Sequence, residues 1–241
     1  MRDFLLSKNM KFPFKLFGIQ HILIIVITII LFLLILILKK KLFKIDNNHF
    51  RILRFIIIFI LLSNMLIYRL SYMHYGVYNI KIHLSLYYCH ITNYLFIFSL
   101  LINQKSFYKI IYGLSWIGAI WTVFFPDFSV GIDCFILYNS FISHNLLLVF
   151  TTLIMVIKKI EYNFKDLFRS MIIAIIIVLF TYVVNYDFKT RFNTPDSILQ
   201  QYTQYSIIGG YDILFFMGII GNLVGLLINK IYKNKKTSKM F

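Results

Sequence analysis

Seven apolar stretches, each about long enough to cross a bilayer as a helix, dominate the sequence of 241 residues. A membrane-spanning helix needs roughly 20 mostly apolar residues. The stretches that meet this requirement are residues 19–38, 52–68, 84–102, 108–125, 135–157, 167–186 and 207–228. They predict an all-α fold, a polytopic membrane helix bundle with seven transmembrane helices, in which residues 1–241 form a single integral membrane domain.

The composition and the charge agree with this prediction. The chain is 60% hydrophobic and has a mean hydropathy of +0.79, which exceeds what a soluble domain can bury. Its net charge of +16 would suggest nucleic-acid binding in a soluble protein. Here the basic residues lie between the apolar stretches and at the C-terminus, where they set topology and contact anionic lipids. We therefore expect membrane lipids, and no nucleic acid, as partners.

The first apolar stretch has the basic flank of a signal peptide. Its core is too long for one, however, and no small-residue cleavage site follows it. We expect this segment to be retained as the first span of a multi-pass protein of the cell membrane.

The distribution of Lys and Arg predicts the orientation. Eight of the 25 lie in the N-terminal segment and in the loops on the same side of the membrane, and the other seventeen lie on the opposite side. Basic residues are enriched on the cytoplasmic side. The N-terminus is thus predicted to be outside and the C-terminus to be cytoplasmic.

Neither cysteine belongs to a metal-binding motif. Cys89 and Cys134 show no CxxC or Cys/His spacing, and no HExxH or aspartate-rich motif occurs. We predict no metal site, no cofactor and no disulfide framework.

Four of the predicted spans carry polar residues at helical spacing. The stripes are Ser85, Cys89, Thr92, Ser99 and Asn103 in the third span; Ser140, Ser143, His144 and Thr151 in the fifth; Ser170, Thr181 and Asn185 in the sixth; and Asn64, Tyr68 and Ser71 in the second. Polar groups in a bilayer face the bundle interior or a water-filled cavity. The stripes therefore predict a shared polar cavity.

The depth of these residues places that cavity near the outer surface. At 1.5 Å per residue, Cys89 lies about 8 Å and His144 about 14 Å below the outer ends of their spans. His21 and Asn185 also lie near outer ends. A channel would have polar residues at all depths. The alternative without function is that the hydroxyls bond their own helices and that Cys89 is an inert buried thiol.

The glycines of the seventh span, Gly218, Gly221 and Gly225, predict close helix packing.

Several short motifs give the chain a resemblance to a known family. They are Phe17-Gly18-Ile19-Gln20-His21, Leu84-Ser85-Leu86-Tyr87-Tyr88-Cys89, Pro126-Asp127, Phe141-Ile142-Ser143-His144 and Asn185-Tyr186. In order and spacing the series resembles the YwaF-like family of bacterial integral membrane proteins. That family is distantly similar to a eukaryotic seven-span protein proposed to transfer acyl chains between phospholipids with a cysteine and a histidine.

The resemblance implies that Cys89 and His144 are the catalytic pair of a phospholipid acyltransferase. A thiol activated by an imidazole suits acyl transfer, and His21, Asn64 or Asn185 are candidates to line the cavity and stabilise the oxyanion. Two other functions remain open on the sequence: a small-solute transporter that uses the same cavity, and a non-catalytic membrane scaffold in which the stripes hold helices together.

Overall fold

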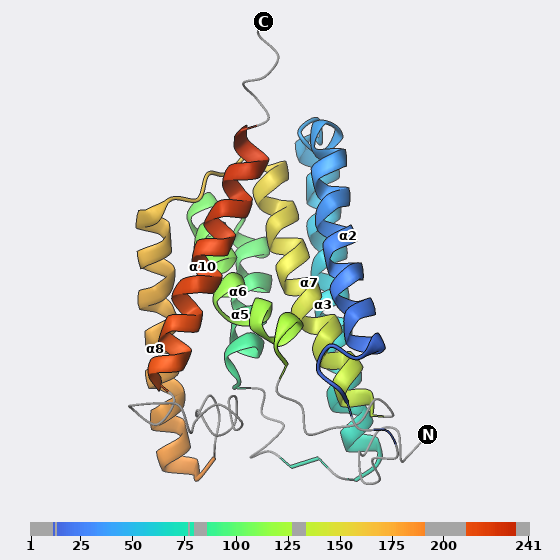
Figure 1. Cartoon of the computed structure of the whole chain (residues 1–241), viewed down its shortest axis with the longest axis vertical. Coiled ribbons are helices and arrows are strands. Elements are labelled where there is room, and N and C mark those ends of the chain that lie inside the picture. The colour runs from blue at the N-terminus through green and yellow to red at the C-terminus, as the bar shows by residue number, and fades with distance from the viewer. Residues whose placement is uncertain are drawn as a thin grey trace, which may run out of the picture.

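The computed structural model describes residues 12, 14–76, 78–79, 86–126, 134–190 and 211–234 (Figure 1). Seven α-helices occur in this part of the chain: α2 (Ile19–Leu42), α3 (Asn47–His74), α5 (Tyr88–Ile102), α6 (Lys105–Phe124), α7 (Phe135–Ile157), α8 (Phe164–Phe188) and α10 (Tyr211–Asn234). Each helix overlaps one of the seven apolar stretches. The predicted all-α fold is confirmed.

Six of these helices are long and apolar enough to cross a membrane, namely α2, α3, α6, α7, α8 and α10. The remaining helix, α5, has 15 residues, which corresponds to a length of about 22 Å. This is less than the roughly 30 Å of a bilayer's hydrocarbon core. Residues 84 and 85, the predicted start of this span, lie outside the described residues. The structure therefore supports six candidate spans, while the seventh span and the orientation of the termini stay predictions.

The outer faces of the helices are apolar. Ile37 is 74% exposed, Phe59 72% and Phe168 65%, and many other Ile, Leu and Phe side chains are also exposed. An apolar surface that extends around a whole bundle is unfavourable in water and is the normal surface of a protein in lipid. The chain is a multi-pass helical membrane protein.

Several helices extend beyond their apolar stretches because polar residues determine where they begin. The second span was predicted from residue 52, but α3 begins at Asn47, after Asp46 accepts a hydrogen bond from the His49 N–H at 2.8 Å. The sixth was predicted from residue 167, but α8 begins at Phe164, behind a reciprocal capping box formed by Asn163 and Asp166. Such caps satisfy the first N–H groups of a helix outside the hydrocarbon.

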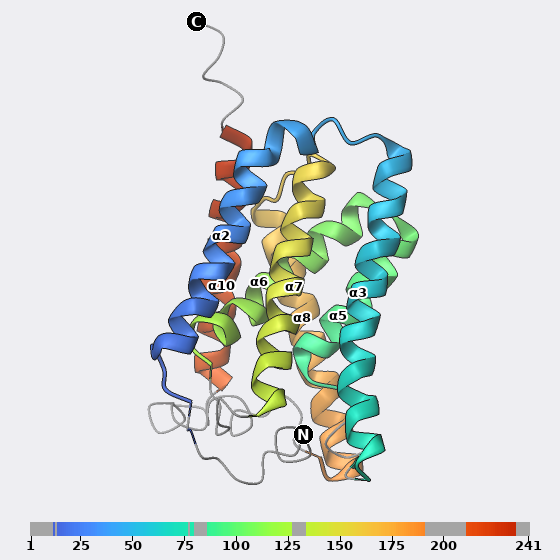
Figure 2. The same cartoon turned by 90° about the vertical axis from the view of Figure 1, so that its right-hand side faces the viewer.

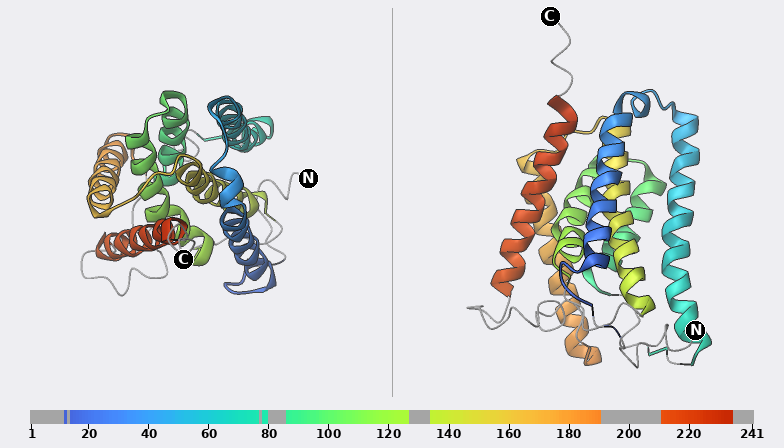
Figure 3. Two further views of the ribbon diagram at one scale, coloured as in Figure 1. Left: turned by 90° about the horizontal axis from the view of Figure 1, so that it is seen from above. Right: turned by 45° about the vertical axis from the view of Figure 1, so that its right-hand side comes forward.

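The two helices α6 and α7 form the centre of the bundle (Figure 3). In the apolar 18-residue stretch of each helix, 61% of the residues are buried in α7 and 50% in α6, against 17% in the peripheral α2. Consecutive helices run in opposite directions (Figures 1 and 2). One end of the bundle, where α2, α5, α7 and α10 end, is called the basic end below, because the Lys39–Lys41 and Lys158–Lys159 runs lie there. The opposite end is called the cavity end.

Glycines allow α10 to pack closely on α6. A Cβ atom at Gly221 would lie 2.1 Å from the carbonyl oxygen of Trp116, and one at Gly225 would lie 2.6 Å from the Trp116 ring. The predicted packing role of these two glycines is therefore confirmed. Gly218 differs, because a Cβ there would be 3.4 Å from its nearest neighbour, which is an ordinary contact distance.

A buried polar network connects α8 and α10 to the turn between α7 and α8. The Tyr162 hydroxyl donates to Asn222 Oδ1 at 2.6 Å and lies 3.1 Å from Ser170 Oγ. The Tyr162 N–H donates to Asn229 Oδ1 at 2.9 Å, and Asn229 Nδ2 donates to the Ile160 carbonyl at 3.2 Å. Asn222 Nδ2 donates to the Leu167 carbonyl at 3.4 Å. We call Tyr162, Ser170, Asn222 and Asn229 the Tyr162 network; each of these side chains has a protein partner.

Candidate functional site

A cavity of about 620 Å³ lies toward the cavity end, between α5, α6, α7, α8 and α10. Its lining divides into two parts. The polar part comes mainly from α5 and α7 and consists of Tyr68, Tyr87, Tyr88, Cys89, His90, Asn93, Thr122, Asn139, Ser140, Ser143 and His144. The apolar part comes from α6, α8 and α10 and includes Ile117, Met171, Ala174, Ile175, Val178, Leu179, Leu214, Phe215 and Met217.

Cys89 lies in the first turn of α5, which begins at Tyr88, and it carries a free thiol. The thiol contacts α6 at Gly118, where an added Cβ would lie 3.2 Å from Cys89 Sγ and 2.7 Å from the Tyr88 ring. A larger residue at position 118 would occupy the space in which these side chains lie. Cys89 is therefore positioned where the polar and apolar parts of the cavity meet.

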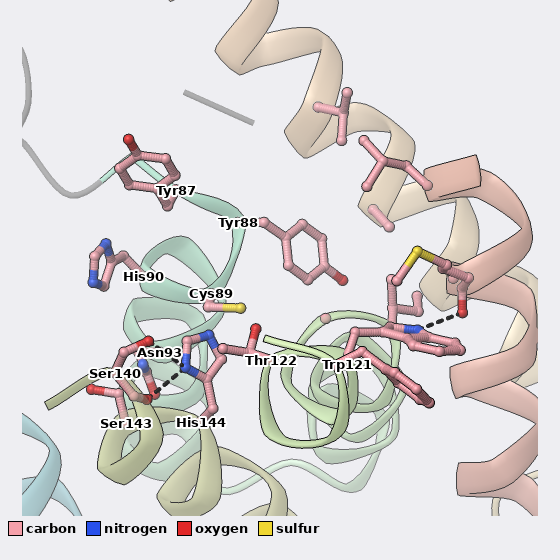
Figure 4. Close-up of a pocket in the computed structure, with 18 of the residues that line it drawn as sticks. Tyr87, Tyr88, Cys89, His90, Asn93, Trp121, Thr122, Ser140, Ser143 and His144 are labelled. Atoms are coloured by element: carbon pink, nitrogen blue, oxygen red, sulfur yellow. Dashed lines mark hydrogen bonds between the residues drawn. The ribbon is translucent and has the colours of Figure 1, made fainter. Parts of the chain in front are cut away.

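His144 lies on α7, and its ring is oriented by its own helix. Nδ1 is 2.6 Å from the Ser140 carbonyl oxygen and 3.3 Å from Ser140 Oγ. A carbonyl oxygen only accepts hydrogen bonds, so Nδ1 carries the proton and, in the neutral ring, Nε2 keeps its lone pair. Figure 4 shows Nε2 on the side of the ring that faces Cys89 and Thr122. The structure thus places the thiol and an imidazole lone pair in the same cavity.

Two further polar side chains of α5 reach the cavity, and both have an atom without a partner. Asn93 is 2% exposed, and neither its Oδ1 nor the buried Nδ1 of His90 has a hydrogen-bond partner among the described residues. Buried polar atoms are almost always hydrogen-bonded, so an unpaired polar atom in a residue that lines a cavity is a candidate to bind a polar group there. Both residues line the same cavity as Cys89 (Figure 4).

The sequence pattern did not single out His90 or Asn93 for this site. It grouped Cys89 with hydroxyl residues, whereas the lining residues of α5 are Tyr88, Cys89, His90 and Asn93. An available signal was the side-chain type, because a buried amide costs more to leave unpaired in a bilayer than a hydroxyl, which can bond its own helix.

Most of the hydroxyls in the predicted stripes do bond their own helices. Thr92 donates to the Tyr88 carbonyl at 2.9 Å, Ser99 to Phe96 at 2.8 Å and Thr151 to Leu147 at 2.7 Å. Each acceptor lies one turn earlier in the same helix. The stripe members that line the cavity are Tyr68, Cys89, Ser140, Ser143 and His144. None of the α8 stripe, Ser170, Thr181 and Asn185, is a lining residue, so the prediction that all four stripes meet at one cavity is wrong for α8.

The other three predicted site residues, His21, Asn64 and Asn185, are not among the lining residues. His21 is fully buried. It accepts the Phe17 N–H at Nδ1 (3.0 Å) and donates from Nε2 to the Val123 carbonyl (2.9 Å), so it joins the start of α2 to the end of α6. Both ring nitrogens are thus occupied by backbone groups.

Asn64 and Asn185 have different positions. Asn64 Nδ2 donates to the hydroxyl of Ser143, so Asn64 supports the cavity wall from α3. Asn185 Oδ1 accepts from the Thr190 hydroxyl at 2.8 Å, near the C-terminal end of α8. Of the five predicted residues, Cys89 and His144 therefore line the same cavity, and Asn64 bonds Ser143 of its wall.

The profile of the TMEM164 family matches residues 16–201, which cover α2 to α8 and include Cys89, His90, Asn93 and His144. Neither the curated proteins nor the solved structures gave a match.

Proposed function

This chain belongs to the TMEM164 family, and we propose that it is a membrane enzyme that transfers acyl chains between phospholipids through Cys89 and His144. The observation that carries the proposal is the position of the Cys89 thiol in the same cavity as the unprotonated Nε2 of His144, at the boundary between a polar and an apolar lining. An ester group has the same division, with a polar carbonyl attached to an apolar chain. Partners are membrane lipids, and the reaction requires no cofactor.

In the first half-reaction, Cys89 Sγ attacks the ester carbonyl of a donor phospholipid while His144 Nε2 accepts the thiol proton. The tetrahedral intermediate then breaks its C–O bond, and the imidazolium gives the same proton to the departing alkoxide. The products are a lysophospholipid and a thioester on Cys89. The Ser140 carbonyl, which holds Nδ1–H at 2.6 Å, stabilises the imidazolium between these two steps.

In the second half-reaction, a hydroxyl of an acceptor lysophospholipid attacks the thioester. His144 Nε2 accepts the hydroxyl proton and returns it to Cys89 Sγ as the C–S bond breaks. The hydroxyl of Thr122, which lies beside the thiol and the ring in Figure 4, is positioned to donate to the oxyanion in both halves. We propose Thr122 for this role ahead of His21, whose ring nitrogens bond backbone groups.

The reaction fits a chain that passes seven times through the cell membrane, with α5 as the short seventh pass and the cavity end on the outer side. Labelling of single introduced cysteines with an impermeant maleimide tests this topology. A cysteine at Lys40 should be protected in intact cells, and one at Lys15 should be labelled. The reverse pattern would place the cavity in the inner leaflet.

Acyl transfer in reconstituted vesicles tests the proposed activity. The purified chain is supplied with a phospholipid that carries a fluorescent acyl chain and with a lysophospholipid acceptor. Cys89→Ala should lower the transfer rate by at least about 100-fold, since the covalent route is lost. Cys134→Ala is the matched control, because Cys134 is the other of the two cysteines in the chain and does not line the cavity. Its rate should be unchanged.

Mass spectrometry of the protein during turnover adds a direct readout. A thioester-linked acyl adduct should be found on Cys89 and disappear after hydroxylamine treatment. Equal transfer by Cys89→Ala and the unmodified chain would contradict the proposal. A non-catalytic scaffold would instead show no transfer with either protein. A transporter would show solute uptake that does not depend on the thiol.

A further inference from the structure

The apolar part of the cavity reaches the surface of the bundle. On α8 and α10, three of its lining residues are also strongly exposed, Ile175 at 44%, Leu179 at 59% and Phe215 at 47%. The inner wall is buried, with Ala174 at 6% exposed and Met171 at 8%. The same cavity therefore runs from an outer opening between α8 and α10 to the interior of the bundle.

The arrangement of α8 and α10 explains this opening. The two helices are joined by the Tyr162 network, in which Asn222 of α10 donates to the Leu167 carbonyl of α8. Toward the cavity end they diverge, and Figure 2 shows the first turns of α10 well apart from the last turns of α8. The start of α10 instead stays on α6, because Trp121 Nε1 donates to the Met217 carbonyl at 2.8 Å.

The surroundings of the opening determine what can pass through it. The neighbouring outward side chains of α8 are apolar as well, with Ile172 57% exposed and Ile176 56% exposed. This face belongs to a candidate membrane span, so it lies against lipid chains. The apolar part of the lining contains no charged residue, and the cavity volume falls in the range of about 300–1,000 Å³ that is usual for small-molecule sites. A hydrocarbon chain is the ligand that matches these conditions.

We propose that the gap between α8 and α10 is a lateral port through which one acyl chain of a bilayer phospholipid enters the cavity. The chain passes between Leu179 and Phe215 and lies along Met171 and Ala174. Its carbonyl then reaches the boundary at Gly118, where Cys89 Sγ lies. Binding of the chain depends only on the port, whereas the placing of the carbonyl rests on the proposed function.

The port implies that the inner wall sets the length of chain that fits. A Cβ at Gly218 would lie 3.4 Å from Ile117 Cγ2 and 3.7 Å from Met171 Cε, which are ordinary contact distances, and because Gly218 lines the cavity a longer side chain there would occupy cavity space. Gly218→Leu should fill the inner end of the apolar part of the cavity. Phospholipids with shorter chains should then be preferred over those with longer chains.

Photochemical labelling tests the port in the full chain reconstituted in lipid nanodiscs. The probe is a phosphatidylcholine with a diazirine in the middle of one acyl chain, and the labelled residues are identified by mass spectrometry. We expect labels at Met171 and Ala174. Replacing both Ile175 and Leu179 by Trp should lower this interior labelling at least fivefold, because the bulky rings close the opening.

A matched control is available one position along the helix. Ile176 and Phe180 are 56% and 54% exposed but do not line the cavity. Replacing both by Trp places the same rings in the same lipid and should leave interior labelling unchanged. Equal labelling in the two double variants, or labelling confined to outward residues, would overturn the port. If the port variant does not fold, Gly218→Leu provides a second test, since its side chain should fill the apolar part of the cavity and lower the labelling at Met171.

The Cys89→Ala protein separates this inference from the proposed function. Interior labelling should persist in it, because chain binding does not need the thiol. Labelling that persists while the unmodified chain shows no acyl transfer would support the port and contradict the proposed catalysis. Thiol-dependent transfer at an unchanged rate in the port variant would retain the catalysis and remove the port.

Discussion

The Tyr162 network and the polar lining of the cavity bury the same kinds of side chain in different bonding states. In the network, both polar atoms of Asn222 and both of Asn229 have protein partners. In the cavity, Asn93 is just as buried, yet its Oδ1 has no partner among the described residues. Asn93 and Asn222 are 2% and 0% exposed, so they differ not in burial but in whether the side-chain oxygen is hydrogen-bonded, which decides the energetic cost of burying it.

This difference separates residues that hold the fold from residues that meet a ligand. A satisfied buried network stabilises the protein only while all of its members are present, and loss of one member leaves the others unpaired. An unsatisfied group costs stability in the empty protein and regains it when a ligand binds. Substitutions in the Tyr162 network should thus lower stability and leave activity unchanged. Substitutions in the polar lining of the cavity should lower activity and leave stability nearly unchanged.

The largest expected effect is on catalysis. His144→Ala should lower acyl transfer by about 10²–10⁴-fold, the usual contribution of a general base, with little change in thermal unfolding. Asn229→Ala, in the Tyr162 network, should instead lower the unfolding temperature and leave the specific activity of the folded protein unchanged. The comparison fails if His144→Ala unfolds the protein or if Asn229→Ala abolishes transfer in the folded fraction.

A smaller effect is expected from the two buried asparagines. Asn222→Leu should lower the free energy of unfolding by about 1–3 kcal/mol, because it removes the nearer acceptor of the Tyr162 hydroxyl and the donor to the Leu167 carbonyl. Asn93→Leu removes an atom that has no partner and should be neutral or slightly stabilising. Denaturant titration in detergent measures both values, and a larger loss for Asn93→Leu would indicate that its amide has a structural role.

The glycines of α10 sharpen the same contrast through packing. Gly221→Ala should destabilise the protein by about 1–3 kcal/mol, because its Cβ would meet the Trp116 carbonyl at 2.1 Å. Gly218→Ala adds a Cβ at 3.4 Å from its neighbour and should be neutral or stabilising, since Ala favours a helix over Gly. Thermal unfolding of the two single variants decides between these outcomes, and equal loss of stability would mean that the cavity wall is packed as tightly as the helix contact.

The smallest effect concerns pH and the loop between α2 and α3. The pKa of Asp46 is lowered from 3.8, mainly by the hydrogen bonds that its carboxylate accepts from the His49 backbone and side chain. A lowered folded-state pKa gives stability above the unfolded value, and this stability is lost as the pH falls through the folded value. Asp46→Asn keeps a capping oxygen but loses the charge.

The unmodified chain should therefore unfold at a slightly higher temperature than Asp46→Asn at pH 7. The difference should shrink as the pH falls below about 4, the ordinary pKa of an aspartate, and disappear below the lowered folded-state pKa. Activity should be equal in the two proteins at every pH, because Asp46 lies far from the cavity end. A pH-independent difference in unfolding temperature would mean that the cap acts through geometry alone.

The helices were predictable because the length of an apolar run is a direct physical requirement of a bilayer. Their ends were less predictable. Residues such as Asp46 and Asn163 begin helices in polar sequence, where no apolar pattern marks the start. The third stretch was predicted as a full span, but its helix begins at Tyr88, and no hydropathy average distinguishes a helical residue from an extended one.

The sequence predicted that Cys89 and His144 share a cavity, and both line it, while their catalytic role stays a prediction. Cys89 and His144 were indicated by their chemistry and by resemblance. The direction of a side chain around a helix, however, depends on which neighbours surround that helix. His21 has the chemistry of a site residue, but its position opposite the end of α6 gives both ring nitrogens backbone partners. Asn93 lacked a catalytic motif and became visible only through its unsatisfied oxygen.

The shortness of α5 has a consequence for the membrane itself. Its first turn lies deeper in the bundle than the ends of α3 and α8 (Figure 2), and its length of about 22 Å is below the thickness of the hydrocarbon core. Hydrophobic mismatch of this kind is relieved by local thinning of the bilayer. With α5 as the proposed seventh pass, headgroups and interfacial water would lie closer to Tyr87 and His90, and the ester linkage of a neighbouring lipid would lie nearer to the level of the thiol.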